Sequence, residues 1–322
     1  HRGCAPRAGD SSGGAEVKVR RAQPWLGTLV DIQVEGDDAM RLRSACDDAF
    51  GRIAEIHAAL SFQSPDSELT HVNRMAQTDW VGLSPDFTAV LAAALDFARL
   101  GDGNFDPCVG GRLVAAGRLP RHAGFPEKTN GNWRAIEFDG ERLRFRAPLL
   151  LDFSGIAKGH AVDQALATLR STGVAAATVN AGGDLAHFGH TPIPFELRDP
   201  THPTRLLRLA QITCGAAATS ADYFQPGQLI DPADGTLLCR ASSITVLAAD
   251  CLTADALTKI VAADPKHAPA RLAHHGAQAI LFDAEGLHLG DAKGWRTVYA
   301  AVRSATPIAG HGQRPQPVTA LN

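Results

Sequence analysis

The segment LLLDFSGIAKGHAVD (residues 149–163) combines an apolar run, a glycine-containing turn and the start of a helical pattern. The apolar run predicts a buried strand over 149–153 that delivers Asp152 to its end. Lys158 follows in the turn, and apolar residues then recur at helical spacing until Gly173 ends the helix. Free N–H groups and the helix dipole favour an anion at such a helix start, and a lysine adds positive charge. The segment therefore predicts a site for an anionic, phosphorylated ligand.

A plain packing role explains the same segment without any ligand. Strand, glycine turn and helix occur in many α/β proteins for packing alone, and the segment matches neither a P-loop nor the GxGxxG pattern. The next predicted strand is closed by Asn-Ala-Gly-Gly-Asp at 180–184, which equally fits a tight turn. Gly-Gly supplies positive φ there, and Asn and Asp accept turn hydrogen bonds. The segment alone leaves both interpretations open.

The composition describes a globular chain with a large core. Its 322 residues are 45% hydrophobic and 20% charged, which is ordinary for a soluble protein. A net charge of -3 gives no reason to expect a nucleic-acid partner or binding to an acidic membrane surface. No apolar run is long enough to cross a bilayer, so the sequence predicts no transmembrane segment.

The cysteines and the N-terminus leave the cellular compartment open. The 6 cysteines are widely spaced, and no Cys-x-x-Cys or Cys/His grouping indicates zinc, so buried thiols explain them best. Their disulfide state stays open. Cys4 after Gly3 is compatible with the lipid-bearing cysteine of an exported lipoprotein, although His1 and Arg2 do not resemble the apolar end of a signal peptide.

Residues 21–303 are predicted to form one domain. The Gly-, Ser- and charge-rich residues 1–20 predict a disordered leader, and the Pro- and Gly-rich residues 304–322 predict a loose tail. Hairpin-spaced strands outnumber helices, which predicts an α+β fold with a mainly antiparallel sheet flanked by helices. The predicted helices are 38–60, 84–100, 159–172, 253–263 and 267–274. The predicted strands are 28–34, 135–138, 143–145, 149–153, 174–179, 194–198, 206–212, 243–248, 278–282 and 298–303.

Seven short motifs follow one another along most of this domain. Besides the 152–184 segment they are Leu26-Gly27-Thr28, Ser61-Phe62 through Pro65-Asp66-Ser67-Glu68-Leu69 to Asn73, Gly103-Asn104-Phe105-Asp106-Pro107 with Val109-Gly110, Thr219-Ser220-Ala221-Asp222-Tyr223, Ile230-Asp231-Pro232 with Gly235, and Ala254-Asp255-Ala256-Leu257. With these motifs in this order, the chain resembles the ApbE family, the FAD:protein FMN transferases. Each motif is weak alone, whereas the shared order indicates a divergent member.

The resemblance implies an ApbE-like, T-fold-like α+β core with FAD held between its two halves. It also implies magnesium-assisted cleavage of the FAD diphosphate, transfer of FMN to a threonine or serine of a membrane redox subunit, and release of AMP. Such a phosphoryl centre needs cations and N–H donors before a neutral hydroxyl can attack it, and magnesium would clamp its oxygens. FAD and an acceptor flavoprotein subunit are the implied partners. An exported, periplasmic or lipid-anchored location is implied as well, with a cytoplasmic one left open.

The resemblance assigns roles residue by residue. Asp255, the carbonyl of Gly155 and Thr258 fall at the magnesium site, which suits hard oxygen donors. Asp231, like Asp222, is a candidate for proton transfer, although its Asp-Pro pair fits an ordinary turn equally well. The catalytic candidates are thus Asp255, Lys158 and Asp231. The cofactor-binding candidates are Gly27, Thr28, Gln63, Asn104, Phe105, Asp106, Asp152, Lys158 and Ile230.

Lys259 is the most consequential departure from the family pattern. It stands four residues after Asp255, where the family typically has a threonine. The two side chains share a helix face, so an exposed ion pair of about 0.3–0.5 kcal/mol is one interpretation. A protonated lysine cannot ligate a metal but carries the charge of a cation. We therefore expect Lys259 to weaken or reshape the magnesium site.

Three further departures concern catalysis and the flavin. Gln228 replaces a histidine, and an amide cannot take a proton from a hydroxyl as a histidine does. Gln63 stands at or next to a flavin-stacking tyrosine, with Phe62 as an alternative stacking residue. Ala221 replaces a glycine and removes backbone freedom. An FMN transferase is the leading prediction. The alternatives are a flavin-binding carrier or accessory protein with reduced catalysis, and an FAD pyrophosphatase that releases FMN and AMP.

Overall fold

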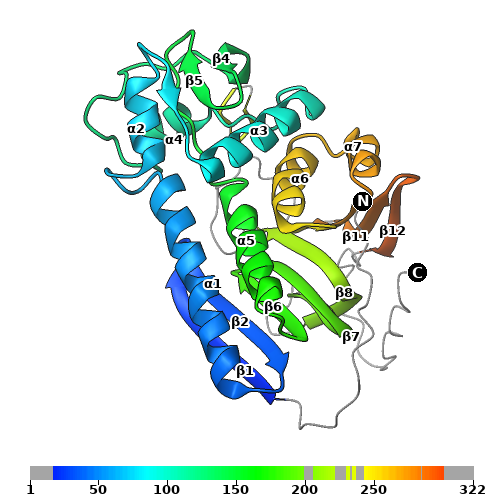
Figure 1. The fold of residues 1–322 in the computed structure, drawn as a ribbon. Coiled ribbons are helices and arrows are strands. Elements are labelled where there is room, and N and C mark those ends of the chain that lie inside the picture. Colours follow the sequence, from blue (N-terminus) through cyan, green and yellow to red (C-terminus); the bar gives the residue numbers. More distant parts are fainter. Residues whose placement is uncertain are drawn as a thin grey trace.

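The fold is built on one large antiparallel sheet. A computed structural model describes residues 17–198, 206–221, 230–232, 234–236, 243–283 and 285–300 of the chain. The sheet has nine strands in the order β1-β2-β6-β7-β8-β9-β10-β11-β12, and neighbouring strands are antiparallel (Figure 1). The predicted α+β fold with a mainly antiparallel sheet is confirmed. The strands are β1 (Val17–Trp25), β2 (Thr28–Gly36), β6 (Ala176–Ala181), β7 (Asp184–Arg198), β8 (Leu206–Ser220), β9 (Ser243–Ala248), β10 (Gln278–Asp283), β11 (Gly286–Asp291) and β12 (Gly294–Ala300).

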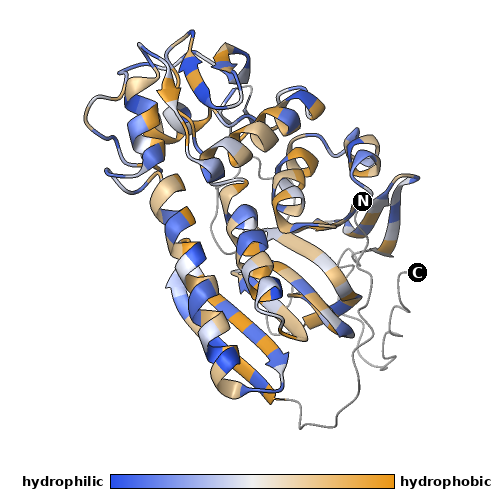
Figure 2. Cartoon of the chain, in the orientation of Figure 1, coloured by the Kyte–Doolittle hydropathy of each residue, from blue (hydrophilic) through white to orange (hydrophobic). Residues whose placement is uncertain are grey.

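Two pairs of helices cover one face of this sheet. α1 (Ala39–Leu60) and α5 (Ala157–Ser171) lie side by side over β2 and β6, and α6 (Cys251–Ala263) and α7 (Ala268–His274) pack on the half that contains β8 to β11 (Figure 1). Val30, Ile32 and Val34 of β2 are buried in the same core as α1 and α5 and alternate with more polar neighbours. The alternation along β1 and β2 is visible in Figure 2. Each of these four helices was predicted within a few residues of its observed bounds.

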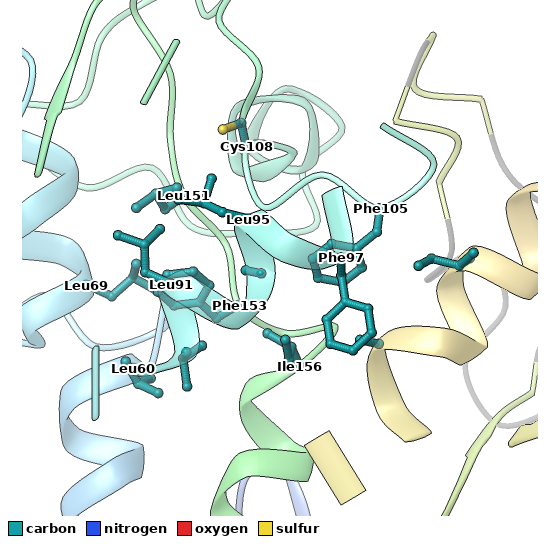
Figure 3. Close-up of a cluster of buried hydrophobic side chains, with 14 of the residues drawn as sticks. Leu60, Leu69, Leu91, Leu95, Phe97, Phe105, Cys108, Leu151, Phe153 and Ile156 are labelled. Carbon is teal, nitrogen blue, oxygen red and sulfur yellow. The ribbon is translucent and has the colours of Figure 1, made fainter. Parts of the chain in front are cut away.

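A smaller lobe lies at one end of the sheet (Figure 1). It contains α2 (Glu68–Met75), α3 (Pro85–Leu100), α4 (Gly110–Ala115), the 3-10 turn η1 (Trp133–Ala135) and a second sheet of β3 (Val81–Gly82), β5 (Arg142–Phe145) and β4 (Ile136–Phe138). Figure 3 shows the core of this lobe, where Phe97, Phe105 and Phe153 gather with leucines. α3 begins as predicted, because the hydroxyl of Ser84 accepts the N–H of Phe87.

The predicted strand 149–153 is wrong. Leu150 makes a single parallel bridge to Val109, and the rest of the segment runs through the core without strand partners. The amide of Asn73 takes the place of a partner strand: it accepts the N–H of Leu151 at 2.7 Å and donates to the Leu151 carbonyl at 2.9 Å. The N–H of Asp152 donates to the carbonyl of Pro107 at 2.7 Å. A continuous apolar run indicates burial, and here side chains satisfy the buried backbone instead of a sheet.

Several other boundaries differ from the prediction. β1 begins at Val17, so the last four residues of the predicted leader belong to a strand, whereas residues 1–16 and the predicted tail lie outside the described residues. β7 and β8 are longer than predicted. The predicted ranges 194–198 and 206–212 pair only with each other, and the missed parts include residues 184–188, which pair with β6, and 216–220, which pair with β9. β12 starts earlier than predicted, and α2, α4 and β11 were not predicted. α2 and α4 are too short to show helical periodicity.

None of the helices that the structure describes is long and apolar enough to span a membrane.

Candidate functional site

Two lysines and two buried aspartates form a cluster where α5, α6 and β7 meet. Lys158 in the first turn of α5 places its Nζ 2.8 Å from Oδ2 of Asp184, the first residue of β7. One turn apart on α6, the ammonium of Lys259 contacts Oδ1 of Asp255. The carboxylate side chains of Asp184 and Asp255 are 2% and 1% exposed, whereas those of Lys158 and Lys259 are 28% and 21% exposed. We call these four residues the charge cluster. Its carboxylates are buried, and its lysine side chains are partly exposed.

The charge cluster is held by a close contact between the starts of α5 and α6. The N–H of Gly159 donates to Oδ2 of Asp255 at 3.2 Å. A Cβ at Gly159 would lie 2.4 Å from the carbonyl oxygen of Cys251, so only glycine permits this approach. Asp163 on α5 accepts the N–H groups of Cys251 and Leu252, each at 2.8 Å. Asp163 therefore caps the first turn of α6 and fixes where Asp255 lies relative to Lys158.

A glycine turn delivers Asp184 to the charge cluster. Gly182 and Gly183 link β6 to β7 with φ angles of 64° and 105°, and the N–H of Gly183 donates to Oδ1 of Asn180 at 3.0 Å. The tight-turn interpretation of 180–184 is thus confirmed. A Cβ on Gly182 would lie 2.4 Å from the hydroxyl of Thr28, so the β1–β2 turn lies directly beside it.

The electrostatics of the charge cluster keep the lysine charged. Burial disfavours the ammonium of Lys158, but the Asp184 and Asp255 carboxylates outweigh this and raise its pKa above the ordinary value. Burial and the neighbouring Asp255 raise the pKa of Asp184 to about 6, although Lys158 and Lys259 act in the opposite direction. Burial also raises the pKa of Asp163 to about 7 against the effect of its two N–H donors. The site combines charged lysines with carboxylates that burial makes easier to protonate.

Gly155 and Phe105 lie directly against Lys259. A Cβ built on Gly155 would be 3.4 Å from Cε of Lys259 and 3.5 Å from Cε2 of Phe105. The hydroxyl of Thr258 donates to the carbonyl of Asp255 at 2.7 Å and lies 2.8 Å from the hydroxyl of Ser220 on β8. The structure therefore brings together Gly155, Asp255 and Thr258, the three predicted metal-site residues.

These oxygens do not fit a magnesium ion as they stand. One oxygen of Asp255 binds the Lys259 ammonium and the other accepts a backbone N–H, while Thr258 is engaged by Ser220 and its own helix. Asp184 is already paired with Lys158. In the part of the chain that the structure describes, no group of three or more His, Cys, Asp or Glu side chains is placed to hold a metal ion. Magnesium needs several free oxygen donors in octahedral geometry, and here cationic groups and N–H donors occupy them.

The predicted nucleotide-contacting residues have local partners. The amide of Asn104 donates to Asp264 at the end of α6, at 3.4 Å. Asp106 accepts the N–H of Cys108 at 2.8 Å and that of Trp133 at 3.3 Å, and burial raises the pKa of Asp106. The segment 104–106 thus connects the end of α6, through Asn104, with Trp133 of the lobe, through Asp106.

Asp152 belongs to the loop between the lobe and α5 rather than to the charge cluster. It accepts hydrogen bonds from the N–H and the hydroxyl of Ser154, whereas Lys158 binds Asp184. Burial raises the pKa of Asp152. The sequence suggested Asp152 and Lys158 as neighbours in one turn, and the structure gives each a different partner.

The predicted flavin-pocket residues lie in two places. Gly27 forms the β1–β2 turn with a φ of 71°, next to Thr28, while Gln63 is exposed at the edge of the lobe. Phe62, the alternative stacking residue, is 5% exposed and packs against Phe125 with ring centroids 5.7 Å apart, and a contact of Phe62 with the flavin stays a prediction.

The described residues 230–232 and 234–236 include a contact to α4. The N–H of Asp231 donates to the carbonyl of Thr236 at 2.7 Å, and the guanidinium of Arg112 donates to the carbonyl of Pro232. Ile230 lies at the start of this turn. Roles for Asp231 and Ile230 remain predictions, and Gln228 and Asp222 lie outside the described residues.

Asp184, Asp163 and Ser220 were not among the predicted site residues. All three lie within the quoted motifs, and each is a polar residue adjoining an apolar segment. Only the pairing of distant elements shows that Asp184 neutralises Lys158 and that Asp163 caps α6.

Comparison with known proteins identifies the family. This α+β chain, with its charge cluster at the start of α5, belongs to the ApbE family, whose sequence model matches residues 26–281. It is 27% identical over 285 residues to an FAD:protein FMN transferase of Rhodobacter capsulatus. The aligned residues make up 80% of this chain and 53% of the relative. It is 26% identical over 265 residues to an FAD:protein FMN transferase of Vibrio cholerae. That alignment covers 74% of this chain and 79% of the relative. The chain thus spans about half the length of the Rhodobacter capsulatus relative.

Solved structures agree with this assignment. The ApbE protein of Thermotoga maritima superimposes with a TM-score of 0.75 at 25% identity, covering 86% of this chain and 98% of that one. The flavin transferase ApbE of Vibrio cholerae superimposes with a TM-score of 0.71 at 24% identity, covering 85% and 96%. These structures share the fold of this chain over nearly their whole length.

Proposed function

We propose that this protein is an FAD:protein FMN transferase, which moves FMN from FAD to a threonine or serine hydroxyl of an acceptor protein. The names of its relatives support this proposal. The observation that carries it is the charge cluster, in which two partly exposed lysine side chains pair with two buried carboxylates near the start of α5. Such a site suits a diphosphate that bridges a flavin and an adenosine.

The proposed reaction breaks the phosphoanhydride bond of FAD and forms a phosphoester bond to the acceptor. The acceptor hydroxyl oxygen attacks the phosphorus of the FMN half, the bond from that phosphorus to the bridging oxygen breaks, and AMP leaves with the electron pair. The hydroxyl proton passes to a base, for which Asp231 is the candidate. Lys158 would stabilise the charge that develops on the phosphate oxygens. The acceptor would be a subunit of a membrane redox complex, and the protein would be exported, in the periplasm or anchored by lipid.

The remaining candidates would bind the two ends of FAD. Asn104, Phe105 and Asp106 would contact the adenosine, near Lys259. Gly27 and Thr28 lie beside the Gly182–Gly183 turn that leads to Asp184, so they would place the flavin on the other side of the diphosphate. Gln63 and Ile230 would line the flavin pocket, and Asp152 would support the turn that carries Lys158.

Incubation of the protein with FAD and a domain that carries a flavinylation threonine tests this function. We expect mass spectrometry to show the acceptor gaining the mass of FMN, with an equal amount of AMP released. The gain should be lost in Asp255→Ala and in Lys158→Met and kept in Lys266→Met, which alters an exposed lysine. Free FMN and AMP without a labelled acceptor would instead indicate a pyrophosphatase. Bound, uncleaved FAD would indicate a carrier.

A further inference from the structure

We propose that Lys259 is the resident cation of this site, so that the protein binds a diphosphate with two lysines and without a divalent metal. This inference deepens the proposed function and rests on it for the identity of the ligand. It follows from the disagreement between the predicted magnesium site and the contacts of its residues.

Lys259 lies beside two of the predicted metal-site residues. Its ammonium contacts Oδ1 of Asp255, and its Cε lies 3.4 Å from where a Cβ of Gly155 would be. Two of the three residues that the family resemblance assigns to magnesium, Gly155 and Asp255, thus lie beside the same side chain. Phe105 lies 3.5 Å from the same Cβ position. A metal ion at Asp255 would have to displace the lysine.

The charge balance favours a lysine over an added metal. Asp184 and Asp255 are each matched by one lysine, so the charge cluster is neutral before a ligand arrives. A divalent ion would add two positive charges to a buried neutral group and would separate Lys259 from its buried partner. Separating a buried pair is strongly unfavourable. A diphosphate, in contrast, brings negative charge to two lysine side chains that are partly exposed.

An ammonium supplies part of what a metal supplies. It carries a full positive charge and three N–H donors, so it can bind phosphate oxygens and stabilise the leaving AMP. It does not act as a Lewis acid with fixed octahedral geometry. Ligand binding should therefore be insensitive to chelators.

The first test measures metal uptake by the full-length wild-type protein. The electron paramagnetic resonance signal of free Mn²⁺ should be unchanged by the wild type, in the presence or absence of FAD. Lys259→Thr should remove one equivalent of free Mn²⁺, and the additional change Asp255→Asn should abolish this uptake. Uptake of Mn²⁺ by the wild type that is lost in Asp255→Asn would overturn the proposal.

The second test measures ligand binding in the presence of EDTA, with inorganic pyrophosphate as a probe that contains no flavin. Calorimetry should show that Lys259→Met weakens its binding roughly tenfold or more, about 1.4 kcal/mol per factor of ten. Lys259→Arg, which keeps the charge, and the exposed control Lys266→Met should bind like the wild type. Equal affinity of Lys259→Met and the wild type would overturn the proposal. Binding of pyrophosphate without binding of FAD would contradict the proposed function and leave the lysine site standing.

Discussion

The helices α3 and α6 carry the same kind of ion pair in different surroundings. On α3, Asp96 pairs with Arg99 at 2.5 Å, and on α6 Asp255 pairs with Lys259 one turn later. The carboxylate is 76% exposed on α3 and 1% exposed on α6. In water such a pair contributes about 0.2–1 kcal/mol, whereas a buried carboxylate that loses its partner is left as an unsolvated charge. Pairs one helical turn apart, at i,i+3 on α3 and at i,i+4 on α6, thus have a plain structural meaning on one helix and a proposed functional one on the other.

The difference arises from what each helix packs against. α6 packs against β8 and β9 of the sheet and against α5, and Asp255 faces the start of α5 through the N–H of Gly159. Asp96 and Arg99 lie on the outer side of α3, away from its buried residues Leu91, Leu95 and Phe97. Tertiary packing decides which pair is removed from water.

Breaking the pair on α6 should have the largest effect. Lys259→Met keeps most of the aliphatic stem but leaves Asp255 charged and buried, so we expect a loss of about 3–5 kcal/mol in the free energy of unfolding. Urea denaturation measures this loss. The double variant Asp255→Asn/Lys259→Met should recover much of it, because neither charge remains. A single variant as stable as the wild type would mean that Asp255 is accessible to water.

Widening the contact between α5 and α6 should have the next largest effect. In Gly159→Ala the new Cβ would meet the Cys251 carbonyl at 2.4 Å, so the helices must separate at a loss of about 1–3 kcal/mol. Gly51→Ala on α1 is the matched control, since a Cβ there meets nothing within 4 Å and should be neutral or stabilising. Thermal unfolding of both variants tests the comparison. Similar effects at the two glycines would contradict the close contact.

A pH dependence should arise from His160 on α5, which lies 2.9 Å from Asp86 in the first turn of α3. Asp86 also pairs with Arg52 of α1 at 2.5 Å. Burial lowers the pKa of His160 below 6.5 although Asp86 opposes this, so the unfolded chain takes up a proton before the folded protein does. This contribution makes the folded state less stable as the pH falls below about 6.5.

Replacing the histidine isolates that contribution. In His160→Gln the proton uptake is missing, so the stability of the variant relative to the wild type should improve on acidification. Denaturation about one pH unit above and one below the ordinary histidine pKa of about 6.5 measures it. A constant difference between the two proteins would show that His160 does not titrate differently in the folded state.

The smallest effect is expected on α3. Arg99→Met removes the exposed partner of Asp96, and we expect a change of about 0.2–1 kcal/mol that high salt reduces further. Urea denaturation of Arg99→Met and Lys259→Met in parallel compares the loss of unfolding free energy at the exposed pair with that at the buried pair. A loss at Arg99 as large as that at Lys259 would show that burial does not distinguish the two pairs.

Much of the helical layer could be predicted because its signals are local. The apolar face of 38–60, the Ser-Pro-Asp start of α3 and the helical spacing after Lys158 all act within one element. The run 149–153 could not be assigned correctly, because a continuous apolar stretch shows burial but not its hydrogen-bond partner. That partner is the side chain of Asn73, far away in the sequence.

The candidate site was predicted in part for the same reason. Lys158, Gly155 and Asp255 were identified from motifs, and the spacing of Asp255 and Lys259 showed that they share a helix face. The partner of Lys158 was not found, since Asp184 reaches it only through the pairing of β6 with β7.

The sequence by itself determined the α+β class, the family and the residues that carry charge at the site, because helical spacing, glycine turns and motif order are properties of neighbouring residues. Only the tertiary structure decided which of those charges are buried and which group holds which. Burial and pairing depend on segments that meet after long intervals of chain, and the strength of a charge interaction depends on the water that those segments exclude. For Lys259 this exclusion turns an ordinary helical ion pair into the proposed cation of the site.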